Sequence, residues 1–283
     1  DRAGVALANA SRFQVEHTIS RDLQRLLAPR PLPSVRGAEL AARLLAGSPG
    51  IWIGGDWYDA CELPDGRLAL TIGDVVGHGL RSAVEMTQLR TGLRNLAMEG
   101  LEPVDVLAGA DEFLRRTGDA RFVTCVHAIY WPDTGQLDMA NAGHLRPLHL
   151  PVEGRPRIVP MGPGLPLGGA ADLVRDADRA PIGTCRIVLR PGESILMFTD
   201  GLVESRSQST DEGIEQLIDM LARPNAPVRG PGMPHLRRRR ASAPPGPSAR
   251  DLCRLVLGRL DTETDDGDRD DVAVLVLRRR RWH

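Results

Sequence analysis

Residues 54–79 read GGDWYDACELPDGRLALTIGDVVGHG and place Asp56 and Asp74 among glycines, between segments typical of buried strands. Residues 67–75 alternate large apolar and small side chains, which predicts a strand that carries Asp74 near its end. Asp65 lies in the run LPDGR, and a Pro-Asp-Gly run between two such segments predicts a hairpin turn. A hairpin of this kind brings carboxylates toward the protein interior, where they need positive charge close by.

The length and charge of the chain limit its class. With 283 residues it can bury a sizeable core, as one large domain or one domain with appendages. The formal net charge of −1 gives no reason to expect nucleic acid or an anionic membrane as a partner. No apolar run approaches the ~18 residues of a membrane-spanning helix. The cysteines are widely separated and form no metal-binding pair, which fits a reducing, cytoplasmic location better than a disulfide framework.

The N-terminal stretch has the pattern of an amphipathic helix. Apolar residues recur at helical spacing from Val15 to Leu26, and the run APRPLP at 28–33 ends the helix because proline cannot continue it. It is either a packing helix of its own domain or a linker helix that carries a signal from an upstream domain, by docking on the core or by pairing with its copy in a homodimer. We expect a linker or switch helix at 1–33, a main domain at 34–283, and a missing upstream sensory domain.

The rest of the chain alternates runs of strands with runs of helices. Further strands are expected at 122–131, 136–143, 185–189, 194–200 and 271–278, and helices at 84–96, 103–114, 212–222 and 249–260. Strands joined by hairpins, with the helices in separate runs, favour an α+β fold over βαβ repeats. Residues 223–250 are rich in proline, glycine and arginine, and we expect a disordered insertion there.

Carboxylates recur where the expected strands begin or end. They are Asp56 in GGD, Asp74 in GDVVGHG, Asp200 in FTDG, and Asp270 and Asp271 in RDDVAVL. Two carboxylates ~4 Å apart repel by about 4 kcal/mol at an effective dielectric constant of 20, so such a cluster is tolerable only around cations. Oxygen ligands without histidine or cysteine clusters select Mg²⁺ or Mn²⁺ over zinc.

Seven blocks of the sequence resemble, in order, those of the SpoIIE/RsbU-type serine phosphatases, bacterial members of the PPM (type 2C-like) metal-dependent protein phosphatase superfamily. The blocks are LQRLLAPRPLP (23–33), IGGDWYDACELPDGRLALTIGDVVGHG (53–79), LRTGLRNLA (89–97), ANAGHLRPL (140–148), LPLG (165–168), MFTDGLVESR (197–206) and RDDVAVLVLR (269–278). The resemblance implies a four-layer α-β-β-α sandwich, in which two antiparallel sheets lie face to face and metals bind at one end. It also implies that residues 34–283 form the phosphatase domain.

The same resemblance implies roles for the acidic residues. The implied metal-binding positions are Asp56, Asp74, Val75, Asp200, Asp270 and Asp271. Asp74 would bridge two Mn²⁺ or Mg²⁺ ions, and the backbone carbonyl of Val75 would join the second. Asp200 and Asp270 would complete the first ion, with Asp271 close behind, and Asp56 would bind directly or through water. A two-metal site activates a water for in-line attack on a phosphate, so no protein nucleophile is needed.

Assistance to the leaving group is the step with the weakest sequence signal. Eukaryotic relatives carry a histidine two residues after the bridging aspartate, where this chain has Val76. His78 is the nearest histidine: it serves as a general acid, since histidine titrates near neutral pH, or it packs in the Gly77–Gly79 turn. His144 in NAGH is either a structural turn residue or a catalyst. No arginine clearly matches the phosphate-binding arginine of the eukaryotic enzymes.

Three other interpretations compete with a phosphatase. The run GGDWY superficially resembles the signature of diguanylate cyclases, but that resemblance does not account for TDG or RDDVAVL. The arginine runs at 237–240 and 278–281 are able to neutralise nucleic-acid phosphates, although solvated surface charge explains them more simply. A catalytically silent phosphatase-fold sensor or binding module remains the main alternative.

The sequence therefore predicts a phosphoserine/phosphothreonine protein phosphatase that uses two Mn²⁺ or Mg²⁺ ions. By resemblance, its substrate is a phosphorylated anti-anti-sigma factor, a STAS-domain protein in a sigma-factor regulatory pathway. No nucleic acid and no membrane are expected as partners.

Overall fold

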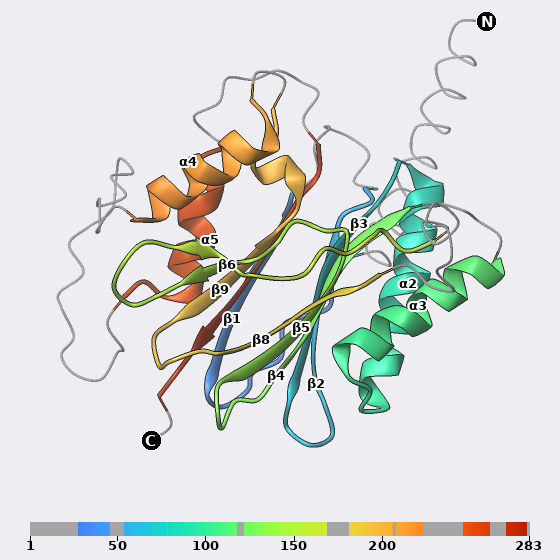
Figure 1. Ribbon diagram of the computed structural model, residues 1–283, viewed down its shortest axis with the longest axis horizontal. Coiled ribbons are helices and arrows are strands. Elements are labelled where there is room, and N and C mark those ends of the chain that lie inside the picture. Colours follow the sequence, from blue (N-terminus) through green and yellow to red (C-terminus); the bar gives the residue numbers. More distant parts are fainter. Residues whose placement is uncertain are drawn as a thin grey trace, which may run out of the picture.

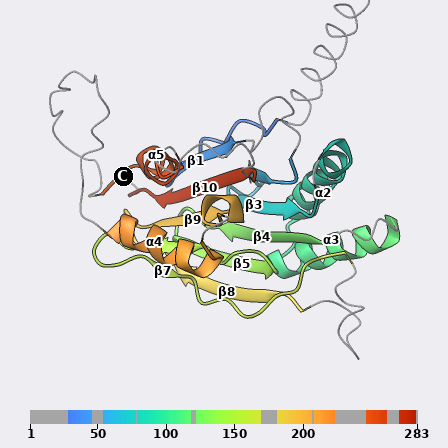
Figure 2. The same ribbon diagram turned by 90° about the horizontal axis from the view of Figure 1, so that it is seen from above.

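The computed structural model describes residues 28–45, 54–77, 79–117, 122–168, 181–205, 208–222, 246–260 and 270–281. Two five-stranded antiparallel sheets pack face to face, and one pair of helices covers the outer face of each (Figures 1 and 2). This is the α+β fold with four layers that the sequence predicts.

The first sheet has the strand order β1-β10-β9-β6-β7. Its strands are β1 (Ala38–Leu45), β10 (Val272–Arg279), β9 (Ser194–Phe198), β6 (Leu148–Leu150) and β7 (Arg157–Ile158). The second sheet has the order β2-β3-β4-β5-β8. Its strands are β2 (Trp57–Glu62), β3 (Leu68–Val75), β4 (Val123–Tyr130), β5 (Gln136–Ala142) and β8 (Gly183–Val188). The predicted hairpin around Asp65 is thus the turn between β2 and β3.

The helices begin and end at residues with recognisable roles. They are α2 (Leu80–Met98), α3 (Pro103–Thr117), α4 (Thr210–Ala222), α5 (Ala249–Leu257) and the short 3-10 helix η2 (Asp200–Leu202). Pro103 opens α3, where its missing N–H costs no hydrogen bond. Ser248 caps α5 through a capping box with Asp251.

The prediction of a disordered insertion at 223–250 is wrong at the C-terminal end of that range. Ala249 and Arg250 form the first turn of α5, and Ala249 is fully buried against the first sheet. The Ser248 cap and the apolar spacing of α5 outweigh the proline-rich composition that precedes them. Residues 223–245 lie outside the described residues, as does the predicted helix in the N-terminal linker.

Apolar side chains fill three layers. One cluster lies between the two sheets, a second between the β2-side sheet and helices α2 and α3, and a third between the other sheet and helices α4 and α5. Successive residues of β2 contribute to different layers: Trp57 is fully buried on the helix side, and Tyr58 packs between the sheets. None of the described helices is long and apolar enough to cross a membrane.

Candidate active site

The acidic residues that the sequence singles out lie where strands of both sheets end. Asp74 is the next-to-last residue of β3, and Val75 after it donates its N–H to the carbonyl of Gly55 at 3.3 Å, beside Asp56. Asp200 opens η2, one residue beyond Thr199, which follows the end of β9. Asp270 and Asp271 immediately precede β10, which pairs antiparallel with β9. The start of β10 and the end of β9 therefore lie side by side.

Glycines permit the close approach of these segments. A Cβ on Gly55 would lie 2.3 Å from the Val75 carbonyl oxygen and 2.6 Å from Asp74 Oδ1. A Cβ on Gly54 would lie 1.6 Å from Asp271 Oδ2, and one on Gly201 would lie 2.1 Å from the Asp271 carbonyl oxygen. Real Cβ atoms do not make contacts this short. A side chain at any of these three glycines would therefore occupy the space that the acidic residues and their backbone now fill.

Burial and mutual repulsion raise the pKa values of these carboxyl groups. The pKa of Asp74 rises to about 6, first because of burial and then because of the charges of Asp200 and Asp270. Burial, followed by repulsion from Asp74, raises the pKa of Asp56 well above its usual value. The pKa of Asp200 is raised by burial and by Asp270. Asp271 also acts on Asp56 and Asp74, so all five carboxylates share one electrostatic environment.

The donor set suits a hard divalent cation. It consists of carboxylate oxygens and the backbone carbonyl of Val75, with the glycine contacts described above keeping that carbonyl beside Asp74. In the ranges that the structure describes, no three Asp, Glu, His or Cys side chains form a group that could hold a metal ion in the geometry shown. The carboxylates repel one another when ionised, and a divalent ion would offset that repulsion.

Thr199 is a site residue that sequence reasoning missed. Its hydroxyl donates a hydrogen bond to Asp56 Oδ2 at 2.7 Å and accepts one from the Ala273 N–H at 2.8 Å. The side chain is fully buried between the end of β9 and the start of β10. Thr199 therefore fixes the Asp56 carboxylate relative to the first sheet and acts as a positioning residue. The threonine before Asp200 in FTDG was the only signal for it in the sequence.

We expect Thr199→Val to raise the Mn²⁺ concentration needed for half-maximal phosphate release about tenfold, equivalent to ~1.4 kcal/mol. Valine keeps the shape of threonine but removes the donor to Asp56 and the acceptor for Ala273. Phosphate release measured across a Mn²⁺ titration checks this. Thr117→Val, which removes a hydroxyl that donates to the Leu114 carbonyl in α3, is the control. An unchanged Mn²⁺ requirement in Thr199→Val would remove Thr199 from the site.

Of the two candidate histidines, the structure describes only His144. His78 lies outside the described residues, so its role as general acid stays a hypothesis. His144 is buried in a turn. Its backbone N–H donates to Asn141 Oδ1 at 2.8 Å, and its backbone carbonyl accepts from Asn141 Nδ2 at 2.9 Å. Its Nδ1 lies 2.9 Å from Thr124 Oγ1, and burial lowers its pKa to about 4. His144 is therefore neutral near pH 7 and bonded as a structural residue of the turn.

Two face-to-face antiparallel sheets between helical layers are also the fold of the PP2C phosphatase domain of SpoIIE from Bacillus subtilis, which aligns with a TM-score of 0.64 and 17% identity over 87% of this chain and 64% of that one. The family model for Stage II sporulation protein E (SpoIIE) matches residues 64–280, and the chain belongs to this family.

Known proteins of this kind are similar over most of the chain. Phosphoserine phosphatase RsbU of Bacillus subtilis (strain 168) is 24% identical over 196 residues, which cover 69% of this chain and 55% of RsbU. The chain thus spans about half the length of that relative. The crystal structure of the RsbU and RsbW domains of Rv1364c from Mycobacterium tuberculosis aligns with a TM-score of 0.71 and 30% identity, over 90% of this chain and 63% of that one. RsbX in complex with magnesium aligns with a TM-score of 0.61 and 13% identity, over 88% of this chain and 98% of RsbX, which shows the shared fold.

Proposed function

We propose that this chain hydrolyses phosphoserine or phosphothreonine esters of a protein substrate, with two Mn²⁺ or Mg²⁺ ions. The observation that carries the proposal is the convergence of Asp56, Asp74, Asp200 and the Asp270-Asp271 pair from both sheets. Membership of the SpoIIE family and the likeness to a phosphoserine phosphatase support it.

Several carboxylates and one backbone carbonyl of the chain would hold the ions. Asp74 would bridge the two ions, the Val75 carbonyl would join one of them, and Asp200 would bind the other. When bound, the ions supply a water of lowered pKa for attack on the phosphate. Asp56, which accepts a hydrogen bond from Thr199, would bind an ion directly or through water.

A cysteine nucleophile is a poorer explanation of the site. Burial raises the pKa of the Cys125 thiol to about 12, and burial also raises the pKa of Cys61 and Cys253. Cys185 lies on β8, and its pKa is likewise raised by burial and by Asp138. These thiols are protonated at neutral pH, so they support a metal-activated water in preference to a covalent phosphocysteine.

Asp270 and Asp271 should contribute unequally to metal binding. Asp270 acts more strongly than Asp271 on Asp74, and it is the leading charge acting on Asp200. The Asp271 carboxylate instead lies against Gly54, and its backbone N–H donates to Asp270 Oδ1 at 2.8 Å. We expect Asp270→Ala to weaken Mn²⁺ affinity far more than Asp271→Ala does. Calorimetric Mn²⁺ titrations of the two variants give the ranking, and the reverse order would assign the ligand to Asp271.

The substrate we propose is a phosphorylated anti-anti-sigma factor, a STAS-domain protein. The family resemblance supports this class, as does the similarity to RsbU and to a chain that joins RsbU and RsbW domains. The test is phosphate release from a serine-phosphorylated STAS-domain protein, compared with a phosphotyrosine peptide under the same Mn²⁺ conditions. We expect release from the first substrate only. Binding of the STAS protein without release would instead favour a catalytically silent module.

A further inference from the structure

The pairing of β3 with β4 continues by one residue beyond the end of β3. Within the two strands, Asp74 lies opposite Thr124. Past the end of β3, the Val76 N–H donates to the carbonyl of Phe122, the residue before β4, at 3.1 Å. Val76 and Phe122, the rim pair, are therefore the next pair that strand alternation places on the same face as Asp74. That face lies between the sheets, because Ile72 packs in the cluster there.

Both members of the rim pair are exposed apolar side chains. Val76 is 53% exposed and Phe122 is 40% exposed. A single exposed apolar residue is ordinary on a protein surface, but two paired ones on one face, beside a group of acidic residues, form a small apolar surface. Residues two positions apart in a strand are ~6.6 Å apart, so this surface begins about that far from Asp74.

The rim pair also lies next to the proposed catalytic centre. Val76 directly follows Val75, whose carbonyl is a proposed metal ligand and approaches Gly55 together with Asp74 Oδ1. A substrate phosphate held at this centre brings its own peptide chain with it. In an extended peptide, side chains two positions apart project from the same side at the same ~6.6 Å spacing. A substrate residue two positions from the phosphorylated one is therefore at the right distance for the rim pair.

We propose that the rim pair binds an apolar side chain of the protein substrate, two residues before or after the phosphoserine or phosphothreonine. This inference rests on the function proposed above, because the metal site fixes the position of the phosphate. An aliphatic side chain such as leucine fits best, since its contact with the Phe122 ring and the Val76 methyl groups removes apolar surface of both partners from water. A polar side chain there would lose hydration without gaining a hydrogen bond from the pair. The rim pair thus selects among phosphorylated segments.

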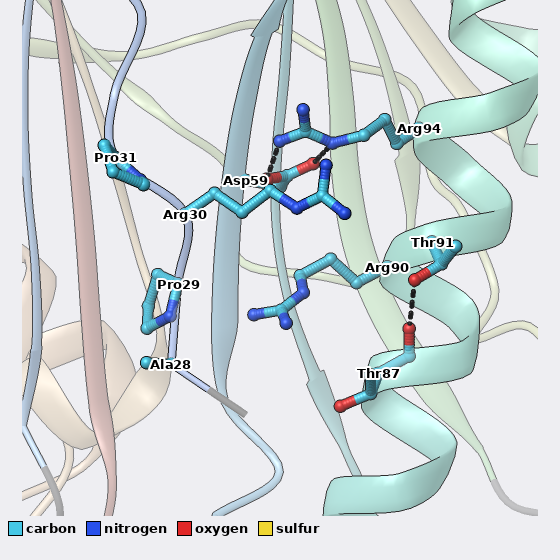
Figure 3. A pocket seen from close by; sticks show the side chains of 9 residues that line it. All are labelled: Ala28, Pro29, Arg30, Pro31, Asp59, Thr87, Arg90, Thr91 and Arg94. Atoms are coloured by element: carbon cyan, nitrogen blue, oxygen red, sulfur yellow. Dashed lines mark hydrogen bonds and ion pairs between the residues drawn. The ribbon is translucent and has the colours of Figure 1, made fainter. Parts of the chain in front are cut away.

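A cavity of about 390 Å³ lies on the opposite face of the same sheet (Figure 3). Its lining comes from the linker before β1, from β2 and from α2. Asp59, which forms an ion pair with Arg94 at 2.8 Å there, lies two positions after Trp57 on β2, and Trp57 packs on the helix side. The sheet separates this cavity from the face that carries Asp74. A side chain close to the phosphoserine therefore contacts the rim pair and not the cavity.

The binding of two fluorescein-labelled peptides in the presence of Mn²⁺ tests this inference. Each peptide carries a hydrolysis-resistant phosphonate analogue of phosphoserine. One has leucine at both positions two residues away from it, and the other has serine at both. We expect the wild type to bind the leucine peptide about tenfold more tightly or better, as measured by fluorescence anisotropy. Phe122→Ser and Val76→Ser should each reduce this ratio to below about threefold.

Val188→Ser is the matched control for these variants. Val188 is 61% exposed and lies opposite Gln136, at the end of the same sheet that is away from Asp74. The substitution removes the same apolar groups as Val76→Ser does, but far from the proposed site. Its preference for the leucine peptide should equal that of the wild type.

Three results would overturn the inference. They are equal binding of the two peptides by the wild type, an unchanged preference in both rim-pair variants, and the absence of saturable binding of either peptide. Phosphate release from the corresponding phosphoserine peptides tests the proposed function separately. Preferential binding of the leucine peptide without any phosphate release would refute the phosphatase activity and would still support the rim pair.

Discussion

Asp74→Asn should lower metal-dependent phosphate release by about a hundredfold or more, equivalent to ~2.7 kcal/mol in the barrier, while the folded protein persists. Asparagine keeps the size of the side chain but removes the anionic oxygen that would bridge two ions. It also removes the repulsion that Asp74 exerts on Asp56 and experiences from Asp200 and Asp270. The thermal midpoint should therefore stay the same or rise, because the carboxylate is a source of strain when no cation offsets it. Initial rates and thermal unfolding, measured on the same preparation, check both parts.

The control for this variant is Asp138→Asn. Asp138 is also a buried aspartate on the same sheet, but it pairs with Arg186 on β8, at 2.6 Å, and plays no part in the acidic cluster. Its replacement should leave the turnover rate near that of the wild type. If Asp74→Asn keeps more than about a tenth of wild-type turnover, a loss below ~1.4 kcal/mol, Asp74 does not bridge catalytic metals.

Gly55→Ala should lower phosphate release about tenfold or more and should also reduce the thermal midpoint. The added Cβ would lie 2.3 Å from the Val75 carbonyl oxygen and 2.6 Å from Asp74 Oδ1. The carbonyl belongs to the backbone of β3 and cannot rotate away, so the segment before β2 must move off the end of β3. That movement separates Asp56 from Asp74 and displaces the Val75 carbonyl. Phosphate release across a Mn²⁺ titration and thermal unfolding measure the two effects.

Gly92→Ala is a matched control, because Gly92 lies within α2 and an added Cβ there meets nothing within 4 Å. This substitution should stabilise the protein by about 0.5–1 kcal/mol, the helical cost of glycine, and leave turnover unchanged. Wild-type rates in Gly55→Ala would mean that the close contact between the two segments is not needed for activity.

The strands that are easy to predict and those that are missed differ in their residues. β3 and β10 are rich in Val, Leu and Ile, so their patterns predict strands without further information. β1 has the sequence AELAARLL, which consists of good helix formers. It becomes a strand because it pairs along its whole length with β10, from Ala38 opposite Arg279 to Leu45 opposite Val272. In β1, pairing with β10 outweighs the local helix propensity, and no local sequence pattern predicts this strand. β6 and β7 are too short to give a periodic signal.

The residues of the candidate site likewise include some that the sequence predicts and some that it does not. The acidic residues were predictable because each follows or precedes an apolar strand and stands next to glycine or another acid. Thr199 was not, because its role depends on hydrogen bonds to Asp56 and Ala273, which are distant in sequence. Spacing along the chain carries no information about contacts of this kind.

Phosphate release from a phosphoserine substrate, followed as Mn²⁺ is added to chelator-stripped protein, tests the two-metal account most directly. The carboxylates from both sheets have pKa values raised by burial and by one another, so we expect divalent cations to be needed for activity. We predict no release without a divalent ion, and release that rises and saturates with Mn²⁺. A full rate in the stripped protein, or no release at any Mn²⁺ or Mg²⁺ concentration, would contradict it.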